Sequence, residues 1–302
     1  MIKKIIVSAS ESNFRIDKLL KMNFSTLTQS FIEKNIRKKN IIVNNEVVTS
    51  KYRLKTNDEI KILNFNKDSY KHNPKIKKKY IIPKNIKALF NESIIYNDNN
   101  FFIINKWSGI STQGGSKINV SIDHIIKDMS NSYNLVHRLD KETSGILIVA
   151  KNLEYTKLFG HMFKQSLIEK KYLAFCQGKP RLPESIVNLD ISLNCNKDKN
   201  AKTITYYKLL NYKSGISQIL FTPKTGKKHQ LRIVSKNLGC PIIGDKKYNS
   251  NNRFDKEKLK LNAIGIKFKI KSKEYIFKSI IPKDFINFIK YNKLNKFDKL
   301  NF

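Results

Sequence analysis

The chain has 302 residues and carries 59 Lys and Arg against 24 Asp and Glu, a formal net charge of +35 at pH 7. A chain of this length can bury a sizeable core as one large domain or two unequal ones. The positive excess predicts a polyanionic partner, of which nucleic acid is the commonest. Part of that charge reflects codon usage, because Lys, Ile and Asn crowd the sequence as an AT-rich genome produces.

The composition argues against several classes of protein. Cys176, Cys195 and Cys240 lie far apart and the five histidines are scattered, so the sequence has no metal-ligand spacing. Sparse, odd-numbered thiols favour a reducing compartment. No apolar run approaches the length of a membrane span, and the first residues turn polar too early for a signal peptide. We therefore expect a soluble cytoplasmic protein that needs no metal and no membrane.

Residues 1–63 have the pattern of a small separate module. On its predicted second helix, apolar residues share one face and basic residues lie on the opposite face, as in a helix that packs on one side only. Asparagine tolerates a positive φ, which favours a two-residue hairpin turn after that helix. The predicted elements are strand 5–7, helix 14–22 with N-cap Asn13, helix 27–39 with N-cap Thr26, strands 41–43 and 46–48 around Asn44-Asn45, and strand 59–63.

Residues 64–85 hold seven lysines, one aspartate and few apolar side chains. Such a segment cannot bury enough surface to offset its ordering entropy, so we predict a basic linker. From residue 86 to 290 hairpins dominate and helices come singly, which predicts an α+β domain with a mixed, mostly antiparallel sheet flanked by helices. The predicted elements are strands 93–96, 101–105, 146–150, 169–177, 203–212, 216–222, 262–268 and 274–280, helices 121–130, 155–165, 228–238 and 282–290, and a basic tail 291–302.

The stretch from Val136 to Gly145 is a charged, polar loop that leads directly into the apolar run 146–150. We interpret it as a loop feeding a buried strand, with Gly145 where the chain must bend. Asp140 is then held against a rigid element, where a catalytic carboxylate would be placed. The alternative is an aspartate that caps a turn. His137 is interpreted as a packed, hydrogen-bonded support.

The string HRLDKETSGILIVAKN at 137–152 resembles the signature of the RluA-type pseudouridine synthases, especially the RluC-like branch that acts on large-subunit (23S) ribosomal RNA. Three further stretches follow the order of that family. The resemblance extends over residues 86–290 and implies that specific uridines are isomerised to pseudouridine. The three stretches are QGGS at 113–116, EKKYLA at 169–174 and TGKKHQLR at 225–232.

The resemblance also implies the roles of four residues. Asp140 would act on the ribose, either by attacking carbon 1′ or by taking the 2′ proton, and Arg232 would pair with it. Tyr172 would stack on the uracil and serve as the base near carbon 5. Arg138 would fill the gap left by the flipped-out uridine. The reaction is redox-neutral and needs no cofactor, in keeping with a sequence that lacks a dinucleotide-binding glycine pattern and a P-loop.

The N-terminal module resembles the small RNA-binding domain first seen in ribosomal protein S-four, on the order of its elements and the opening Arg15-Ile16-Asp17-Lys18-Leu19-Leu20. This resemblance implies that Arg15, Arg37, Lys38 and Lys39 face a phosphate backbone. The alternative is that they form the solvated side of an amphipathic helix. The partner implied by both resemblances is ribosomal RNA, bound by a monomer.

Some residues depart from the family pattern, namely Lys227 and Lys228 where Arg-Thr is usual, Val234 where histidine is common, and Asn249 where glycine is usual. These put the fine positioning of RNA in doubt rather than the reaction. Three alternatives stay open: a synthase acting on tRNA or other rRNA sites, a non-catalytic RNA-binding protein, and a glycoside or nucleoside hydrolase. A hydrolase usually needs two carboxylates across the bond, and Glu142 is the only nearby second acid.

Overall fold

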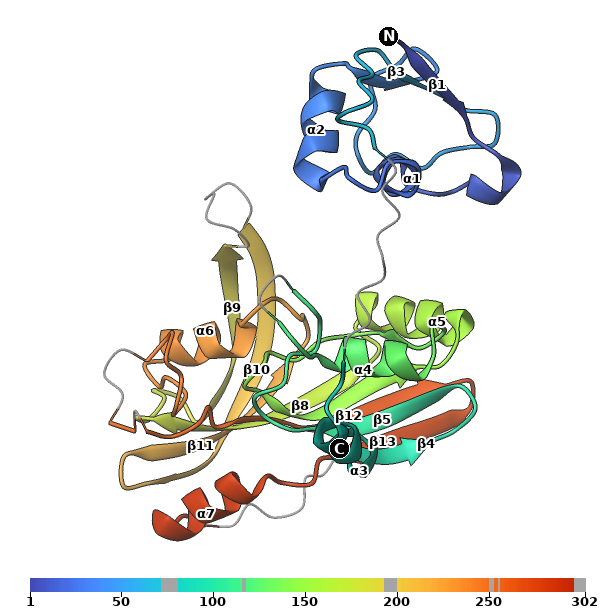
Figure 1. Cartoon of the computed structure of the whole chain (residues 1–302). Helices are drawn as coiled ribbons and strands as arrows, with labels where there is room; N and C mark the ends of the chain where they lie inside the picture. Colours follow the sequence, from blue (N-terminus) through green and yellow to red (C-terminus); the bar gives the residue numbers. More distant parts are fainter. Residues whose placement is uncertain (72–80, 116–117, 193–199, 250–252, 255, 296–302) are drawn as a thin grey trace. The chain divides into compact units, whose positions relative to one another are not determined.

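The architecture comes from a computed structural model that describes residues 1–71, 81–115, 118–192, 200–249, 253–254 and 256–295. The chain divides into two compact units, Met1–Lys79 (the N-terminal unit) and Tyr80–Phe302 (the C-terminal unit), shown in Figure 1. Each unit has its own sheet and its own hydrophobic core.

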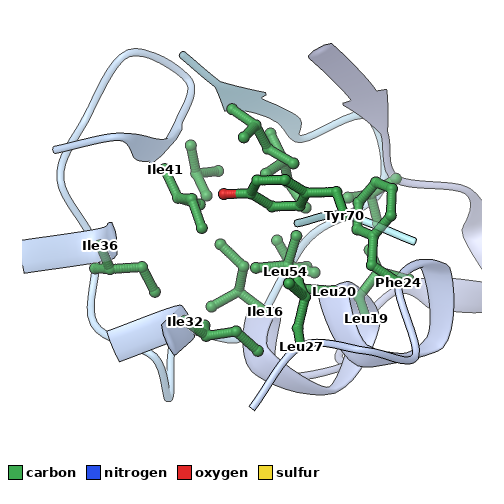
Figure 2. Close-up of a cluster of buried hydrophobic side chains, with 14 residues drawn as sticks. Ile16, Leu19, Leu20, Phe24, Leu27, Ile32, Ile36, Ile41, Leu54 and Tyr70 are labelled. Carbon is green, nitrogen blue, oxygen red and sulfur yellow. The ribbon is translucent and has the colours of Figure 1, made fainter. Parts of the chain in front are cut away.

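The N-terminal unit is a three-stranded antiparallel sheet, ordered β1-β3-β2, with two helices. Ile16, Leu19 and Leu20 are spaced to lie on one face of α1, and each is fully buried. They belong to one core with Ile32 and Ile36 of α2, and Figure 2 shows these side chains converging. The elements are β1 (Lys3–Ile6), a 3-10 turn (Ala9–Glu11), α1 (Ile16–Asn23), α2 (Gln29–Arg37), β2 (Ile41–Val43) and β3 (Glu59–Ile62).

Both helices of the N-terminal unit begin two residues later than predicted. The α2 helix is capped by Thr28, whose hydroxyl accepts the N–H of Phe31 at 3.2 Å. Thr26, the predicted cap, instead donates to the carbonyl of Lys71 at 3.0 Å. The N-cap of α1 is Arg15, and Asn13, the predicted cap, instead takes the left-handed conformation with φ 66°.

The predicted hairpin 41–43/46–48 is only half correct. Asn44 and Asn45 do take positive φ, 49° and 65°, as the turn prediction requires. Residues 46–48 form no strand beyond a single bridge from Glu46, and β2 pairs with β3 instead. The side chain of Asn44 stabilises this register, since it donates to Asp58 and accepts the N–H of Glu59 at 2.9 and 2.8 Å.

The predicted linker 64–85 is folded at both ends. Tyr70 is 5% exposed in the N-terminal core, with Phe65 packed beside it. The helix α3 (Lys84–Glu92) opens the C-terminal unit. The boundaries at 63 and 86 were therefore placed too far into the folded units, and residues 72–80 lie outside the described part of the chain.

The C-terminal unit is built on a ten-stranded sheet ordered β4-β5-β7-β12-β8-β11-β10-β9, with β13 beside β12 and β6 beside β7. The β7–β12 pair is parallel and the other strand pairs of this sheet are antiparallel over the described residues. The predicted α+β class with a mixed, mostly antiparallel sheet is confirmed. The strands are β4 (Ile94–Asn97), β5 (Phe101–Lys106), β6 (Asn134–Leu135), β7 (Ser144–Ala150), β8 (Glu169–Gln177), β9 (Glu184–Ser192), β10 (Asn200–Lys213), β11 (Ile216–Pro223), β12 (Leu261–Ile270) and β13 (Lys273–Lys278).

Helices cover both faces of this sheet, so its central strands are buried on both sides. The helices after α3 are α4 (Ile122–Met129), α5 (Leu153–Lys164), α6 (Gln230–Asn237) and α7 (Lys283–Tyr291). Successive side chains of β7 point to opposite faces of the sheet, and they pack alternately in the hydrophobic cluster under α4 and in the cluster under α5. Successive residues of β8 likewise alternate between α6 and α7. Tyr172 lies on the face that α4 and α6 cover, because it packs against both of their cores.

Three further features of this unit were missed or misplaced by the sequence analysis. The strand β9 was overlooked although Val187, Leu189 and Ile191 alternate with polar residues, a readable strand signal. The helix α3 was missed, because its first two residues were assigned to the linker and no element was predicted for residues 86–92. In the predicted tail, Leu294 is 7% exposed and packs with the core of α7, while residues 296–302 lie outside the described chain.

Candidate active site

Asp140 lies in the loop that precedes β7, with its side chain 20% exposed. The bend predicted at Gly145 is present, with φ 111°. A Cβ at this position would stand 2.3 Å from the carbonyl oxygen of Ala263 on β12, so only glycine lets the two strands approach. Asp140 therefore lies in a loop that leads directly into a central strand of the sheet.

The residues after Asp140 are tied by their backbone to the segment that follows β5. The carbonyl of Lys141 accepts the N–H of Gly109 at 3.0 Å and the ammonium of Lys106 at 3.2 Å. The carbonyl of Glu142 accepts the hydroxyl of Ser108 at 2.8 Å. The main chain of Glu142 is thus tied to the site, while its exposed carboxylate is not among these contacts.

Lys106 is the buried cation beneath this loop. Its Nζ also donates to the carbonyls of Trp107 and Ile110, both at 3.1 Å. Burial lowers the pKa of Lys106 to about 7, while the charges of Glu142 and Asp140 act in the opposite sense. The three carbonyl acceptors match the three N–H donors of the ammonium group, and they therefore also favour the charged form of Lys106.

Arg232 stands beside Asp140, as the resemblance implied, but its hydrogen bonds go elsewhere. Its Nη1 lies 3.9 Å from Asp140 Oδ2, whereas its Nε and Nη2 donate to Asp245 at 2.7 and 2.6 Å. Asp245 is fully buried and also accepts the N–H groups of Lys247 and Tyr248. The sequence analysis missed Asp245, although it noted Asn249 four residues further along the chain.

His229 completes the surroundings of Asp140 and was also missed. Its Nε2 lies 3.9 Å from Asp140 Oδ1, and its Nδ1 is 2.9 Å from the Tyr248 hydroxyl. It takes φ 57° at the start of α6. Burial lowers the pKa of His229, and Arg232 and nearby lysines add to this against the opposing charge of Asp140. The Tyr248 ring lies 5.0 Å from the Arg232 guanidinium, a cation–π contact.

Tyr172, on β8, belongs to the same site. Burial raises the pKa of its phenol, and the negative charge of Asp140 raises it further. Tyr172 is therefore a neutral phenol at ordinary pH. Its side chain packs against the cores under α4 and α6, which leaves its ring wedged between them.

His137 and Arg138 lie just before Asp140 and differ in their surroundings. The Nε2 of His137 accepts the N–H of Ile148 at 2.9 Å, and its ring lies 4.7 Å from that of Phe163. Burial lowers the pKa of His137 to about 3, with Lys170 acting in the same sense. These contacts match the interpretation of His137 as a packed, hydrogen-bonded support. Arg138 is exposed and reaches Gln113 at 3.4 Å.

The loop that holds Gln113 also contains Gly114, the first glycine of the QGGS stretch. A Cβ at Gly114 would lie 2.5 Å from Nε2 of His124. The neighbour that approaches this glycine is therefore a side chain of α4.

The basic residues predicted in the N-terminal unit lie at two places. Arg37, Lys38 and Lys39 are exposed together where α2 ends. Arg15 opens α1 and pairs with Asp17 through two hydrogen bonds of 2.5 and 3.1 Å. The first group therefore carries charge that faces solvent, whereas Arg15 is partly neutralised.

Within the described residues, no group of three or more His, Cys, Asp or Glu side chains could hold a metal ion. No helix of this part of the chain is both long and apolar enough to cross a membrane.

The fold and site match known proteins. The family model for RNA pseudouridylate synthase matches residues 100–237, from β5 to the end of α6, a range that includes Asp140, Tyr172 and Arg232. Among solved structures, Human RNA Pseudouridylate Synthase Domain Containing 4 has a TM-score of 0.61 at 22% identity, covering 70% of this chain and 97% of its own. That likeness concerns the fold.

Curated relatives match most of the chain. The Ribosomal large subunit pseudouridine synthase C of Rickettsia bellii is 38% identical over 93% of this chain and 99% of its own length. The proteins of the same name from Rickettsia prowazekii and Buchnera aphidicola subsp. Baizongia pistaciae are 40% and 31% identical, over 78% and 87% of this chain and 82% and 88% of their own lengths. The chain belongs to the RNA pseudouridine synthases. Within that family its likeness to the large-subunit synthases C, the RluC-like branch, is confirmed.

Proposed function

We propose that this chain converts specific uridines of large-subunit (23S) ribosomal RNA into pseudouridine, with Asp140 acting on the ribose of a flipped-out nucleotide. The observation that carries the proposal is the placement of the Asp140 carboxylate, 3.9 Å from both Arg232 Nη1 and His229 Nε2, in the matched family range. The substrate is supported by relatives named as large-subunit synthases over most of their length. The enzyme acts as a monomer in the cytoplasm.

The reaction breaks the bond between N1 and carbon 1′ and forms a bond between carbon 5 and carbon 1′. Asp140 either attacks carbon 1′ or takes the 2′ proton, and both roles need an ionised carboxylate. The positive charge of Arg232 lies beside this carboxylate, with Nη1 3.9 Å from Oδ2. The proton lost from carbon 5 is balanced by one gained at N1, so the reaction needs no oxidant and no cofactor.

Tyr172 contributes a ring for the uracil to stack on and a hydroxyl near carbon 5. Since its pKa is raised, the phenol accepts the carbon 5 proton only by passing on its own. Asp140, whose charge already acts on this phenol, is the group that receives that proton.

The exposed cations bind the RNA around the target. Arg138 fills the gap that the flipped uridine leaves in the stack. The N-terminal unit acts as an S-four-like RNA-binding domain, in which Arg37, Lys38 and Lys39 contact phosphates and Arg15 contributes from the start of α1. The exposure of the three residues at the end of α2 supports this assignment.

The deciding experiment maps pseudouridines across total RNA in cells that lack this gene, rescued by wild type or by Asp140→Asn. Loss of specific large-subunit sites, restored only by wild type, is the expected result. If the deletion leaves the pseudouridines of ribosomal RNA unchanged but removes pseudouridines from tRNA, the substrate is tRNA. Equal inactivity of both proteins would indicate an RNA-binding protein, and release of free uracil from purified RNA would indicate a hydrolase.

A further inference from the structure

Thr112 makes two buried hydrogen bonds to a single residue, Leu139, which precedes Asp140. Its Oγ1 donates to the Leu139 carbonyl at 2.7 Å and accepts the Leu139 N–H at 3.1 Å. Thr112 is 3% exposed and Leu139 is 4% exposed. One hydroxyl therefore satisfies both polar groups of a buried residue, in the way that a neighbouring strand would.

Thr112 is itself anchored by its main chain. Its carbonyl accepts the N–H of Asp123 at 3.0 Å, and the carbonyl of Ser111 accepts that of Ile122 at 3.0 Å. Both donors belong to the first turn of α4, a helix whose apolar face is buried against the sheet. The hydroxyl of Thr112 thus ties Leu139 to a rigid element.

The two groups that Thr112 holds belong to different peptide planes. The N–H lies in the Arg138–Leu139 peptide and the carbonyl lies in the Leu139–Asp140 peptide. Fixing both planes fixes φ and ψ of Leu139, and therefore where the Cα of Asp140 lies relative to the Cα of Arg138.

We propose that Thr112 is a positioning residue for the isomerisation, which aims Asp140 at the ribose by holding the two peptides around Leu139. The inference rests on the proposed role of Asp140. Displacing a reacting group by about 1 Å costs about a hundredfold in rate, so loss of this hydroxyl should affect the chemical step rather than RNA binding.

Thr143 provides a matched control in the same loop. It is 2% exposed, and its Oγ1 is buried without a hydrogen-bond partner among the described residues. Thr143→Val therefore removes a buried hydroxyl that holds nothing, whereas Thr112→Val removes one that holds two groups at nearly constant volume. Thr112→Ser keeps the hydroxyl and should rescue function.

The experiment measures single-turnover pseudouridine formation on a large-subunit rRNA transcript by the full-length chain, with RNA affinity measured separately. Thr112→Val should lower the rate constant about 10- to 100-fold with affinity within about twofold. Thr112→Ser and Thr143→Val should stay within about threefold of wild type. A merely structural loss would lower the amplitude, which counts active molecules, and leave the rate constant unchanged.

An unchanged rate constant in Thr112→Val, or a Thr112→Ser variant as slow as Thr112→Val, would overturn the inference. If Thr112→Val does not fold, the pair Thr112→Ala and Thr112→Ser makes the same comparison. The Asp140→Asn variant separates the proposed role of Asp140 from the proposed role of Thr112. An active Asp140→Asn removes the proposed role of Asp140 and this inference with it, whereas an inactive Asp140→Asn beside a fully active Thr112→Val removes the inference alone.

Discussion

The guanidinium of Arg232 is locked onto Asp245 by two parallel hydrogen bonds of 2.7 and 2.6 Å. Burial alone would raise the pKa of Asp245, but these bonds and two backbone N–H groups outweigh it and lower the pKa. Burial would likewise lower the pKa of Arg232, and Asp245 reverses that. The pair therefore stays charged, and only Nη1 of Arg232 faces Asp140.

Replacing Asp245 by Asn should cost about 3–5 kcal/mol of folding stability, because it leaves a half-buried guanidinium without its carboxylate. The freed Arg232 should then turn toward Asp140 and lower the single-turnover rate by more than about tenfold. Denaturant unfolding and single-turnover kinetics check the two effects. Asp128→Asn is the control, since its ion pair with Lys87 is partly exposed and should contribute less than about 1 kcal/mol. A wild-type rate in Asp245→Asn would contradict this role.

Tyr172→Phe keeps the ring and removes the hydroxyl. RNA affinity should stay within about twofold, while the rate should fall about 10²- to 10⁴-fold, the usual contribution of a positioned proton acceptor. Because the pKa of the phenol is raised, the wild-type rate should be flat from pH 7 to 9. A rate that climbs about tenfold per pH unit there would point to a phenolate instead.

The control for Tyr172→Phe is Tyr207→Phe on β10. The Tyr207 hydroxyl donates to the carbonyl of Leu182 at 3.0 Å, so its loss should cost about 1 kcal/mol of stability. The rate should be unaffected, because this bond joins residues outside the site. An equal loss of rate in both variants would show that any buried hydroxyl matters, and would remove the special role of Tyr172.

His137 should make folding stability depend on pH. Its folded pKa, about 3, lies below its ordinary value of 6.5, so the unfolded chain gains a proton as pH falls through 6.5 and the folded chain does not. The stabilisation is therefore complete above pH 6.5 and is lost as pH falls from 6.5 toward 3, by about 1 kcal/mol between pH 6 and 5.

Denaturant unfolding at pH 6 and 5 tests this linkage. The His137→Gln variant should lose about 1 kcal/mol less than wild type over that interval, although it starts from a lower stability. His161→Gln, on the exposed side of α5, serves as the control. If wild type and His137→Gln lost the same stability, the imidazole would not be held neutral by the fold.

The basic group at the end of α2 should govern the salt dependence of RNA binding. Changing Arg37, Lys38 and Lys39 together to Gln should reduce the slope of log K against log salt by up to about 2–3, since each lost phosphate contact removes about 0.7–0.9. The rate of bound enzyme should not change. A charge-matched control replaces the exposed Lys269, Lys283 and Lys290 of the C-terminal unit. Equal slopes for the two triple variants would remove the specific role of α2.

The sequence was most informative where a signal is local. The apolar run after Gly145 predicted β7, and the loop before it predicted an aspartate seated against a buried strand. The two asparagines after β2 predicted a turn with positive φ, and both residues have it. Each of these properties is decided by residues that are neighbours in the chain.

Pairings between residues that are far apart in the sequence could not be predicted in the same way. The turn at Asn44 did not reveal that β2 would pair with β3, because that choice is made by Asp58 and Glu59. Arg232 pairs with Asp245, 13 residues away with no periodicity linking them. The clamp between Thr112 and Leu139 joins residues 27 positions apart.

The strand β12 lies between β7 and β8 and joins the two halves of the large sheet. Asp140 precedes β7 on one side of it, and Tyr172 lies on β8 on the other. During synthesis, residues 261–270 leave the ribosome late, whereas the N-terminal unit is complete at Lys79. A growing chain can therefore fold its first unit long before Asp140 and Tyr172 can meet, and a chain that ends before β12 would retain that unit but lack the assembled candidate site.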